Sequence, residues 1–277
     1  MKSEQLPLVF EPEAPPCGGG SAFVEELKAF REFDKETRLE AFPDPAMELP
    51  VFVNEFWTAK QRAASSLHEI SYRACFKPQL PRFFIERLTR PGDRVYDPFM
   101  GRGKTPLEAA LMGRHPVGCD VNPLSRMLLA PRLDPPSEVE VADRLAALPT
   151  TDGDWPRYSE LLAFYHPRTL ERIVALRNYL LERESAGRMD RVDAWIRMVA
   201  TNRLTGHSTG FFPGYALPPN PAVRVAAQIK INGKRQQAPT PRDIDAIIRK
   251  KTRALLGRLD PDGWRRLRGV APNAVLM

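Results

Sequence analysis

The sequence predicts an α/β protein with parallel strands, followed by a helical and basic region. A strand (residues 94–97), a glycine turn, a helix (105–114) and a second strand (115–120) follow one another. That order is typical of a parallel βαβ unit. The helix has Pro106 in its first turn and Gly113 just past its end, as helix boundaries favour. The 277 residues, 43% of them hydrophobic, are enough for one large domain with a substantial core.

Apolar residues at helical spacing predict further helices on both sides of this unit. One helix precedes it, with Phe83, Phe84 and Leu88 expected to face inward and Pro91-Gly92 expected to end it. Other helices are predicted at residues 23–30, 166–184 and 192–199.

The positive charge is concentrated near the end of the chain. Between residues 224 and 268 there are 13 Lys or Arg and four Asp, whereas the whole chain has a net charge of +7. The last clear helix is predicted to follow Thr240 as its N-cap and to turn Arg249, Lys250 and Arg253 outward. Such a segment fits a polyanion, which in a cytoplasmic protein indicates nucleic acid. A solvated basic surface is the alternative.

Composition excludes several other classes of protein. The sequence has no run of 18 apolar residues and no apolar leader at its start, so we expect a cytoplasmic protein without a membrane span. Cys17, Cys75 and Cys119 are widely spaced, which suits neither a disulfide framework nor a zinc site. The four histidines are scattered and form no metal-ligand pattern, so no metal is expected. His68 is expected to cap or to pack.

The turn "YDPFMGRGKT" (residues 96–105) raises the question of whether it wraps a phosphate. A P-loop needs a glycine five residues before Gly103, where this chain has Pro98, which has no N–H. A dinucleotide turn needs a glycine three residues after Gly103, where this chain has Pro106. Both phosphate-binding interpretations therefore fail.

Two acids flank the turn instead. Asp97 ends the first strand and Asp120 ends the second, with Gly101-x-Gly103 between them. A carboxylate at the position of Asp120 accepts from the ribose hydroxyls of a bound nucleoside. Asp97 is placed to meet a cationic amine. These groups describe a nucleoside with an amino-acid tail and no phosphate, which is S-adenosylmethionine. The alternative is an ordinary βαβ turn with acids at its strand ends.

The segment "DPFMGRGKTPLEAALMGRHPVGCDVNPLS" resembles the cofactor motif of amino-directed DNA methyltransferases, which modify cytosine N4 or adenine N6. The family pattern is D-P-F-x-G-S-G-T-T, an E-A-x-x-x-G-R helix and then G-x-D-x-N-P. The chain departs from it at Arg102 and Lys104, which place two cations near the site. The matching residues are Asp97, Pro98, Phe99, Gly101, Gly103, Thr105, Glu108, Ala109, Gly113, Arg114, Gly118, Asp120, Asn122 and Pro123.

The resemblance is close over residues 65–130 and implies a seven-stranded, Rossmann-like methyltransferase fold, incomplete here, with an added helical region. The segment before the turn resembles the part of the family that packs beside the methionine end of the cofactor, with Lys77, Pro78 and Leu80 matching best. The cofactor-binding residues that the resemblance implies are Lys77, Pro78, Asp97, Pro98, Phe99, Gly101, Gly103, Thr105, Asp120 and Asn122.

The family's catalytic tetrapeptide, [DNS]-P-P-[YFW], has no complete counterpart in the chain. In the family it accepts the hydrogens of the target amine and stacks on a base flipped out of the duplex. The Pro-Pro pairs at 15–16 and 218–219 lack the preceding polar residue. Asp134-Pro135-Pro136-Ser137 has the acid but not the aromatic residue. We expect it to be a turn leading into the next helix, and the catalytic residues stay unassigned.

The segment Gly206–Gly210 fits G-x-S-x-G, the nucleophile elbow of α/β-hydrolases. No histidine follows Ser208, and "FFPGYALPP" follows where a helix is needed, so the hydrolase interpretation fails. A loop near the substrate and a surface crossing loop both remain open.

The sequence leads to a hypothesis of a DNA methyltransferase, or its cofactor-binding part, acting on double-stranded DNA with cytosine N4 favoured. On this hypothesis the chain is cut short, or a second polypeptide carries the catalytic motif. The alternative is a non-catalytic, truncated homologue that binds cofactor, nucleic acid or both. A methyltransferase of RNA or small molecules is a weaker option. The predicted division is a disordered arm (1–20), a cofactor-binding α/β domain (21–150) and a helical, basic region that contacts DNA (151–277).

Overall fold

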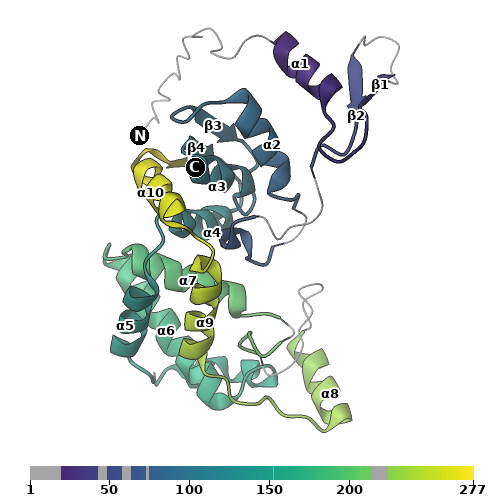
Figure 1. The fold of residues 1–277 in the computed structure, drawn as a ribbon. Helices are drawn as coiled ribbons and strands as arrows, with labels where there is room; N and C mark the ends of the chain where they lie inside the picture. Colours follow the sequence, from purple (N-terminus) through teal and green to yellow (C-terminus); the bar gives the residue numbers. More distant parts are fainter. Residues whose placement is uncertain are drawn as a thin grey trace, which may run out of the picture.

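A computed structural model describes residues 20–42, 49–57, 64–72, 75–151, 153–206, 208–213 and 224–277 (Figure 1). The arm predicted at residues 1–20 lies outside this part of the chain, apart from Gly20, where the first helix begins. The α/β class with a parallel sheet is confirmed. None of the described helices combines the length and the apolar character that a membrane span requires.

The elements, in chain order, are α1 (Gly20–Ala29), β1 (Arg38–Ala41), β2 (Pro50–Val53), η2 (Ser66–His68), α2 (Gln79–Leu88), β3 (Arg94–Asp97), α3 (Lys104–Leu111), β4 (His115–Gly118), α4 (Pro123–Leu133), α5 (Glu138–Ala147), η3 (Trp155–Ala163), α6 (Pro167–Ser185), α7 (Arg191–Arg203), α8 (Val225–Arg235), α9 (Ile244–Leu256), α10 (Pro261–Val270), η4 (Ala271–Asn273) and β5 (Val275–Leu276).

The parallel sheet has the order β3-β4-β5. Asp97 pairs with Gly118 between β3 and β4, and Gly118 pairs with Leu276 between β4 and β5. The resemblance implies seven strands, whereas the described residues contribute three to this sheet. The third strand comes from the far end of the chain, after all of the helices.

Helices α2, α3, α4 and α10 surround the sheet, and α3 contacts each of the other three (Figure 1). Most of α3 is buried, and its apolar residues Leu107, Ala109 and Ala110 are inaccessible to solvent. Helix α4 begins at Pro123 because Asn122 is its N-cap, and the Asn122 side chain accepts the backbone N–H of Leu124. The turn between β3 and α3 is therefore positioned by helices that pack closely on one another.

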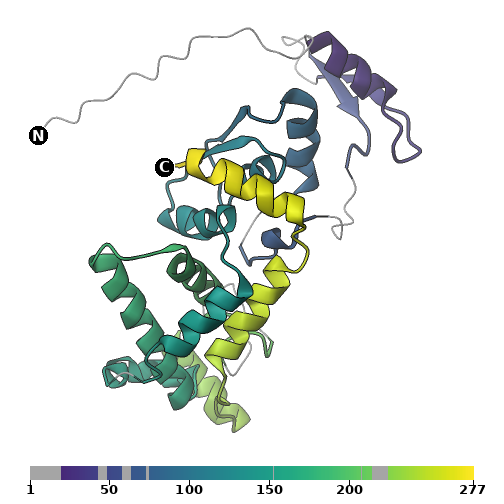
Figure 2. The same cartoon turned by 60° about the vertical axis from the view of Figure 1, so that its left-hand side comes forward.

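Helices α5, α6, α7 and α9 form a second layer below the sheet, with α5 and α9 side by side (Figure 2). A buried carboxylate helps to hold this layer together. Asp193 is fully buried and accepts from Arg183 at 2.8 Å and from Arg144. Arg144 also pairs with Asp190 at 2.7 Å. The network links α5, α6 and α7 through charge-assisted hydrogen bonds.

Among the hydrogen bonds that join the sheet layer to the helical layer, those of Ser66 and Asn202 involve the segment at residues 65–72. The hydroxyl of Ser66 donates to the carbonyl of Leu255 at 2.7 Å. The amide of Asn202 both donates to and accepts from the backbone of Ser71, at 2.9 and 3.1 Å. The segment at residues 65–72 therefore lies between the glycine turn and the helices.

An antiparallel pair, β1 and β2, stands apart from the main sheet with α1 (Figure 1). This part of the chain packs against α2 through aromatic side chains. The ring centroids of Phe30 and Phe56 lie 5.7 and 5.6 Å from that of Phe83. Phe83 is buried as expected, but Phe84 and Leu88 are 38% and 46% exposed, so their predicted inward placement is wrong. Helical spacing alone did not fix which side of α2 faces the core.

Helix α9 begins later than predicted. Asp243, and not Thr240, is its N-cap, and the Asp243 carboxylate accepts the backbone N–H of Ala246 at 2.9 Å. Thr240 lies in the extended segment before the helix. An ionised carboxylate at the N-terminus also meets the positive end of the helix dipole, which favours Asp243.

Candidate functional site

The turn between β3 and α3 is fixed by backbone hydrogen bonds and by two glycines in the left-handed region. The N–H of Met100 donates to the carbonyl of Cys119 at 3.0 Å, which extends the β3–β4 pairing into the turn. Gly101 and Gly103 have φ of 50° and 77°. A Cβ at position 103 would lie 2.7 Å from Leu129, so only glycine fits there without movement of α4.

Asp120 accepts hydrogen bonds from the backbone on both sides of the site. One carboxylate oxygen accepts from the N–H of Asn122 at 2.9 Å, and the other from the N–H of Gly101 at 2.8 Å. These bonds lower the pKa of Asp120, the one to Asn122 most strongly, so the carboxylate is ionised near neutral pH. Each oxygen retains a lone pair that a hydroxyl group can use.

Asp97 lies at the end of the neighbouring strand. Its carboxylate accepts the N–H of Phe99 at 3.0 Å, and Phe99 itself is 87% exposed. Because β3 and β4 are parallel and Asp97 pairs with Gly118, Asp97 and Asp120 follow the same edge of the sheet. The structure thus brings to one edge the two acids that the sequence singled out.

A cavity of about 690 Å³ lies beside the turn. Asn122 is part of its wall, and so is Tyr72, whose ring would lie 3.7 Å from a Cβ on Gly101. Neither Asp97 nor Asp120 lines it. The remaining wall residues are Ser71, Leu124, Leu128, Thr201, Asn202 and Thr205.

Sequence analysis did not find the wall residues from α7 or Tyr72. Thr201 and Asn202 occur about 80 residues after Asn122, in an ordinary amphipathic helix. No local motif marks them, and only the packing of α7 against α4 brings them to the cavity.

Arg102 and Lys104, the departures from the family pattern, face a different cavity. Arg102 donates to the carbonyl of Ile70 and Lys104 to the carbonyl of Phe76. Both line a cavity of about 300 Å³ that shares no wall residue with the first, and Pro78 lines it too. The cations therefore lie away from the cavity beside Asn122.

The other residues that the resemblance implies are spread along the same region. Lys77 is exposed just before α2, and Pro98 is exposed on the turn. Thr105 is half-buried in the first turn of α3 and lines an apolar groove of about 400 Å³ together with Val95 and Leu88. Their assignment to cofactor binding stays a prediction.

The basic residues proposed to contact DNA lie on α9, with both Arg249 and Lys250 exposed. Arg253 is also exposed, but its guanidinium pairs with Glu138 of α5 at 2.5 Å. That carboxylate raises the pKa of Arg253, and Arg253 lowers the pKa of Glu138. Part of the positive charge of α9 is therefore already matched within the chain.

His68 packs, as expected, but with a specific partner. Its Nε2 lies 2.6 Å from the carboxylate of Glu108, and both side chains are buried. Burial lowers the pKa of His68 although Glu108 opposes this, so the imidazole is neutral near pH 7. No group of three or more metal-binding side chains occurs within the described ranges.

Asp134-Pro135-Pro136-Ser137 forms the corner between two helices, as predicted. Asp134 ends α4, and Ser137 is the N-cap of α5 in a capping box with Glu140. This corner supplies helix boundaries, and it has no aromatic side chain of its own to stack on a base.

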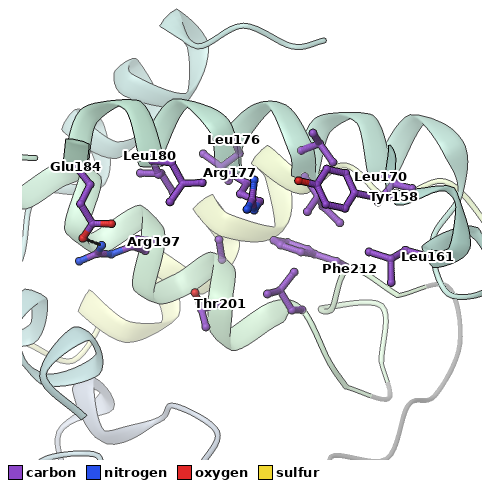
Figure 3. A pocket seen from close by; sticks show the side chains of 15 residues that line it. Tyr158, Leu161, Leu170, Leu176, Arg177, Leu180, Glu184, Arg197, Thr201 and Phe212 are labelled. Atoms are coloured by element: carbon purple, nitrogen blue, oxygen red, sulfur yellow. Dashed lines mark hydrogen bonds and ion pairs between the residues drawn. The ribbon is translucent and has the colours of Figure 1, made fainter. Parts of the chain in front are cut away.

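The helical layer has its own cavity of about 330 Å³ between η3, α6 and α7 (Figure 3). Its wall is mostly aliphatic, with Phe212 on one side and the Arg197–Glu184 ion pair at one end. Phe212 belongs to the loop for which the sequence leaves open a place near the substrate or a surface crossing. A helix, α7, precedes that loop, so the strand that a hydrolase elbow requires is replaced by a helix.

The part of the chain that contains the turn and the two acids is similar to known proteins. Residues 27–125 match the model of the N6/N4 methyltransferase family, whose description is DNA methylase. This span includes the glycine turn, Asp97 and Asp120. The resemblance to amino-directed DNA methyltransferases is therefore confirmed for this part of the chain.

Two curated relatives are similar to the chain over a shorter span. One is the type II methyltransferase M.MjaII of Methanocaldococcus jannaschii, 36% identical over 62 residues. The other is the type II methyltransferase M.BsoBI of Geobacillus stearothermophilus, 35% identical over 69 residues. The aligned parts cover 22% and 24% of this chain but only 12% and 14% of those relatives. No solved structure matches the chain.

Proposed function

We propose that the ends of β3 and β4 bind S-adenosylmethionine, with Asp120 accepting from the ribose hydroxyls and Asp97 facing the cationic amine. The observation that carries the proposal is the pair of acids at one sheet edge, inside the span that matches the DNA methylases. We further infer that β3, β4 and β5 are part of a Rossmann-like methyltransferase fold.

The residues present fit a cationic nucleoside without a phosphate. Within the described residues, neither Asp97 nor Asp120 forms an ion pair, and the nearby Arg102 and Lys104 donate to carbonyls instead. Two unneutralised carboxylates favour a positively charged ligand and disfavour a phosphate. The open backbone at Gly101 permits close approach of that ligand.

S-adenosylmethionine supplies a methyl group on a sulfonium, which an amine can attack without any metal ion. The function that we propose is transfer of this methyl group to the exocyclic amine of a base in double-stranded DNA, with cytosine N4 favoured. The chain has no complete [DNS]-P-P-[YFW] tetrapeptide to accept the amine hydrogens. We therefore propose that a second polypeptide supplies it.

A non-catalytic role is the second candidate, and the corner at Asp134–Ser137 favours it. The only near-match to the tetrapeptide is committed to capping α4 and α5, which leaves the chain with a binding site and no catalytic loop. In this case the chain binds the cofactor, DNA or both, and transfers nothing.

Calorimetry with the purified chain and S-adenosylmethionine tests the binding proposal. We expect saturable heat from the wild type, and a much weaker signal from Asp120→Ala. Asp143→Ala is a matched control, since Asp143 is an exposed acid on α5 outside the site. The absence of heat from the wild type would refute the binding site.

Incubation with labelled S-adenosylmethionine and duplex DNA separates the two candidate functions. We expect the chain alone to bind cofactor without labelling DNA, and labelling to begin when a polypeptide that carries the tetrapeptide is added. Robust labelling by the chain alone would contradict the need for that polypeptide. Persistent lack of labelling with the added polypeptide, despite cofactor binding, would favour the non-catalytic role.

A further inference from the structure

The two cations that depart from the family pattern converge on one cavity of about 300 Å³. Arg102 comes from the glycine turn and Lys104 from the first residue of α3, and Arg258 reaches the cavity from the segment after α9. His68 and Glu69 are the other described wall residues with side chains that can carry a charge. We call this the cationic cavity.

Positive charge exceeds negative charge in the cationic cavity. The one carboxylate among its described wall residues, Glu69, lies 4.0 Å from Arg258, and both side chains are more than half exposed. Among the described residues no carboxylate forms an ion pair with Arg102 or Lys104, although Lys104 is 4% exposed. Lys104 is buried and Arg102 is half-buried, and cations shielded from water are normally paired, so these two call for a partner of opposite charge.

Behind the cavity wall lie a cation, Arg132, and a carboxylate, Glu108, which His68 contacts at 2.6 Å. Arg132 is fully buried and donates only to carbonyls, those of Leu128 at 2.8 Å, Leu67 at 3.2 Å and Arg102. Burial lowers its pKa to about 9. Burial also lowers the pKa of Lys104, and Arg102 lowers it further. An anion in the cavity would oppose these effects.

Donor groups at the cavity are only partly used. The Nε of Arg102 is buried without a hydrogen-bond partner, while its terminal nitrogen donates to Ile70. The ammonium of Lys104 has three protons, of which the carbonyl of Phe76 takes one and the side chain of Cys75 another.

We propose that the cationic cavity binds one phosphate group. A phosphate offers several oxygen acceptors and one or two negative charges, which match a guanidinium fork and two further cations. A metal cation is disfavoured by the same charges. The phosphate belongs either to the DNA backbone or to a free phosphate or mononucleotide, and the chemistry of recognition is common to both.

Calorimetry with inorganic phosphate, at constant ionic strength against chloride, tests the site directly. The informative variant is Arg102→Ser with Lys104→Thr, which introduces the small hydroxyl residues usual in the resembled family. We expect phosphate binding by the wild type and at least about tenfold weaker binding by this variant. The control, Arg157→Ser with Arg265→Ser, removes two exposed arginines outside the cavity, and we expect less than a twofold change.

Unfolding midpoints of both double variants show whether each is folded. If the first is not, Arg258→Ser serves in its place, because Arg258 is an exposed side chain on the cavity wall. No heat from wild-type protein with phosphate, or equal affinity in wild type and variants, would overturn the proposal.

Two further arms identify the source of the phosphate and separate this site from the proposed cofactor site. If the source is DNA, a duplex oligonucleotide displaces phosphate, whereas displacement by a nucleoside 5′-monophosphate alone indicates a small ligand. Asp120→Ala should retain phosphate binding, and the cavity variant should retain binding of S-adenosylmethionine. Competition between phosphate and S-adenosylmethionine would overturn the separate site, since the cavity would then hold the carboxylate of the cofactor.

Discussion

The two sides of the glycine turn differ in charge and in how that charge is held. On one side, Asp97 and Asp120 accept backbone N–H groups and leave lone pairs free. On the other side, Arg102 and Lys104 donate to backbone carbonyls and leave donors free. The main chain keeps the opposite charges from neutralising each other. One short turn can therefore present an acidic site and a basic site at once.

The largest expected effect is on the acidic side. Asp120→Ala removes the carboxylate that we propose accepts from two ribose hydroxyls, and we expect a loss of roughly 1.5–3 kcal/mol of cofactor binding free energy per hydrogen bond. Calorimetry measures this loss, and phosphate affinity should stay within twofold. A parallel loss of phosphate binding would show that the two sides are not independent.

The next largest effects are expected at the glycines of the turn, because the turn holds both the acidic and the basic side chains in place. In Gly103→Ala a Cβ would clash with Leu129 in a left-handed conformation, and we expect a loss of roughly 2–5 kcal/mol in the free energy of unfolding. Gly101→Ala meets no such clash, since the nearest atom would be 3.7 Å away, so about 1–2 kcal/mol is expected. Urea unfolding of both variants checks the order, and equal losses would contradict the packing argument.

Acid should weaken the acidic side selectively. The pKa of Asp120 is lowered in the folded protein from its ordinary value of 3.8, mainly by the N–H groups of Asn122 and Gly101. Its contribution to stability is therefore complete above pH of about 4 and is lost as pH falls through the lower folded pKa. Unfolding measured from pH 6 to pH 2 should show a smaller acid loss in Asp120→Asn than in the wild type. Parallel curves would mean that Asp120 is not held by these bonds.

The smallest expected effects concern the predicted contact between helix α9 and the phosphates of DNA. Lys250→Ala should weaken binding of duplex DNA uniformly across sequences and reduce the salt slope by about 1. Arg253→Ala should do less, because Arg253 already pairs with Glu138. Titrations at several salt concentrations measure both slopes, with Glu138→Ala as the control that frees Arg253. No change in any variant would reduce this surface to a solvated face.

The acidic side could be found from the sequence because its spacing is local. Asp97, Gly101 and Asp120 lie within one βαβ unit, where strand ends and turn glycines have fixed positions. The basic side could not, because the sequence shows Arg102 and Lys104 beside the same glycines. Only the packed structure shows that they turn toward His68.

Contacts that depend on distant segments were beyond sequence analysis. Tyr72 and Asn202 line the same cavity beside the turn although 130 residues separate them. The start of α9 was placed at Thr240 because a hydroxyl before a proline is a common helix signal, yet the carboxylate of Asp243 caps the helix. Thr240 and Asp243 lie three residues apart and both are common capping residues, so local preference alone cannot rank them.

The pairing of β5 with β4 has a consequence for how the protein acquires its structure. About 160 residues separate Gly118 from Leu276, and the entire helical layer is inserted between them. Pairing so remote along the chain is slow to form, because a long loop must close before any contact rewards it. During synthesis the edge of β4 that precedes Asp120 therefore stays unpaired with β5 until residues 275–276 have left the ribosome.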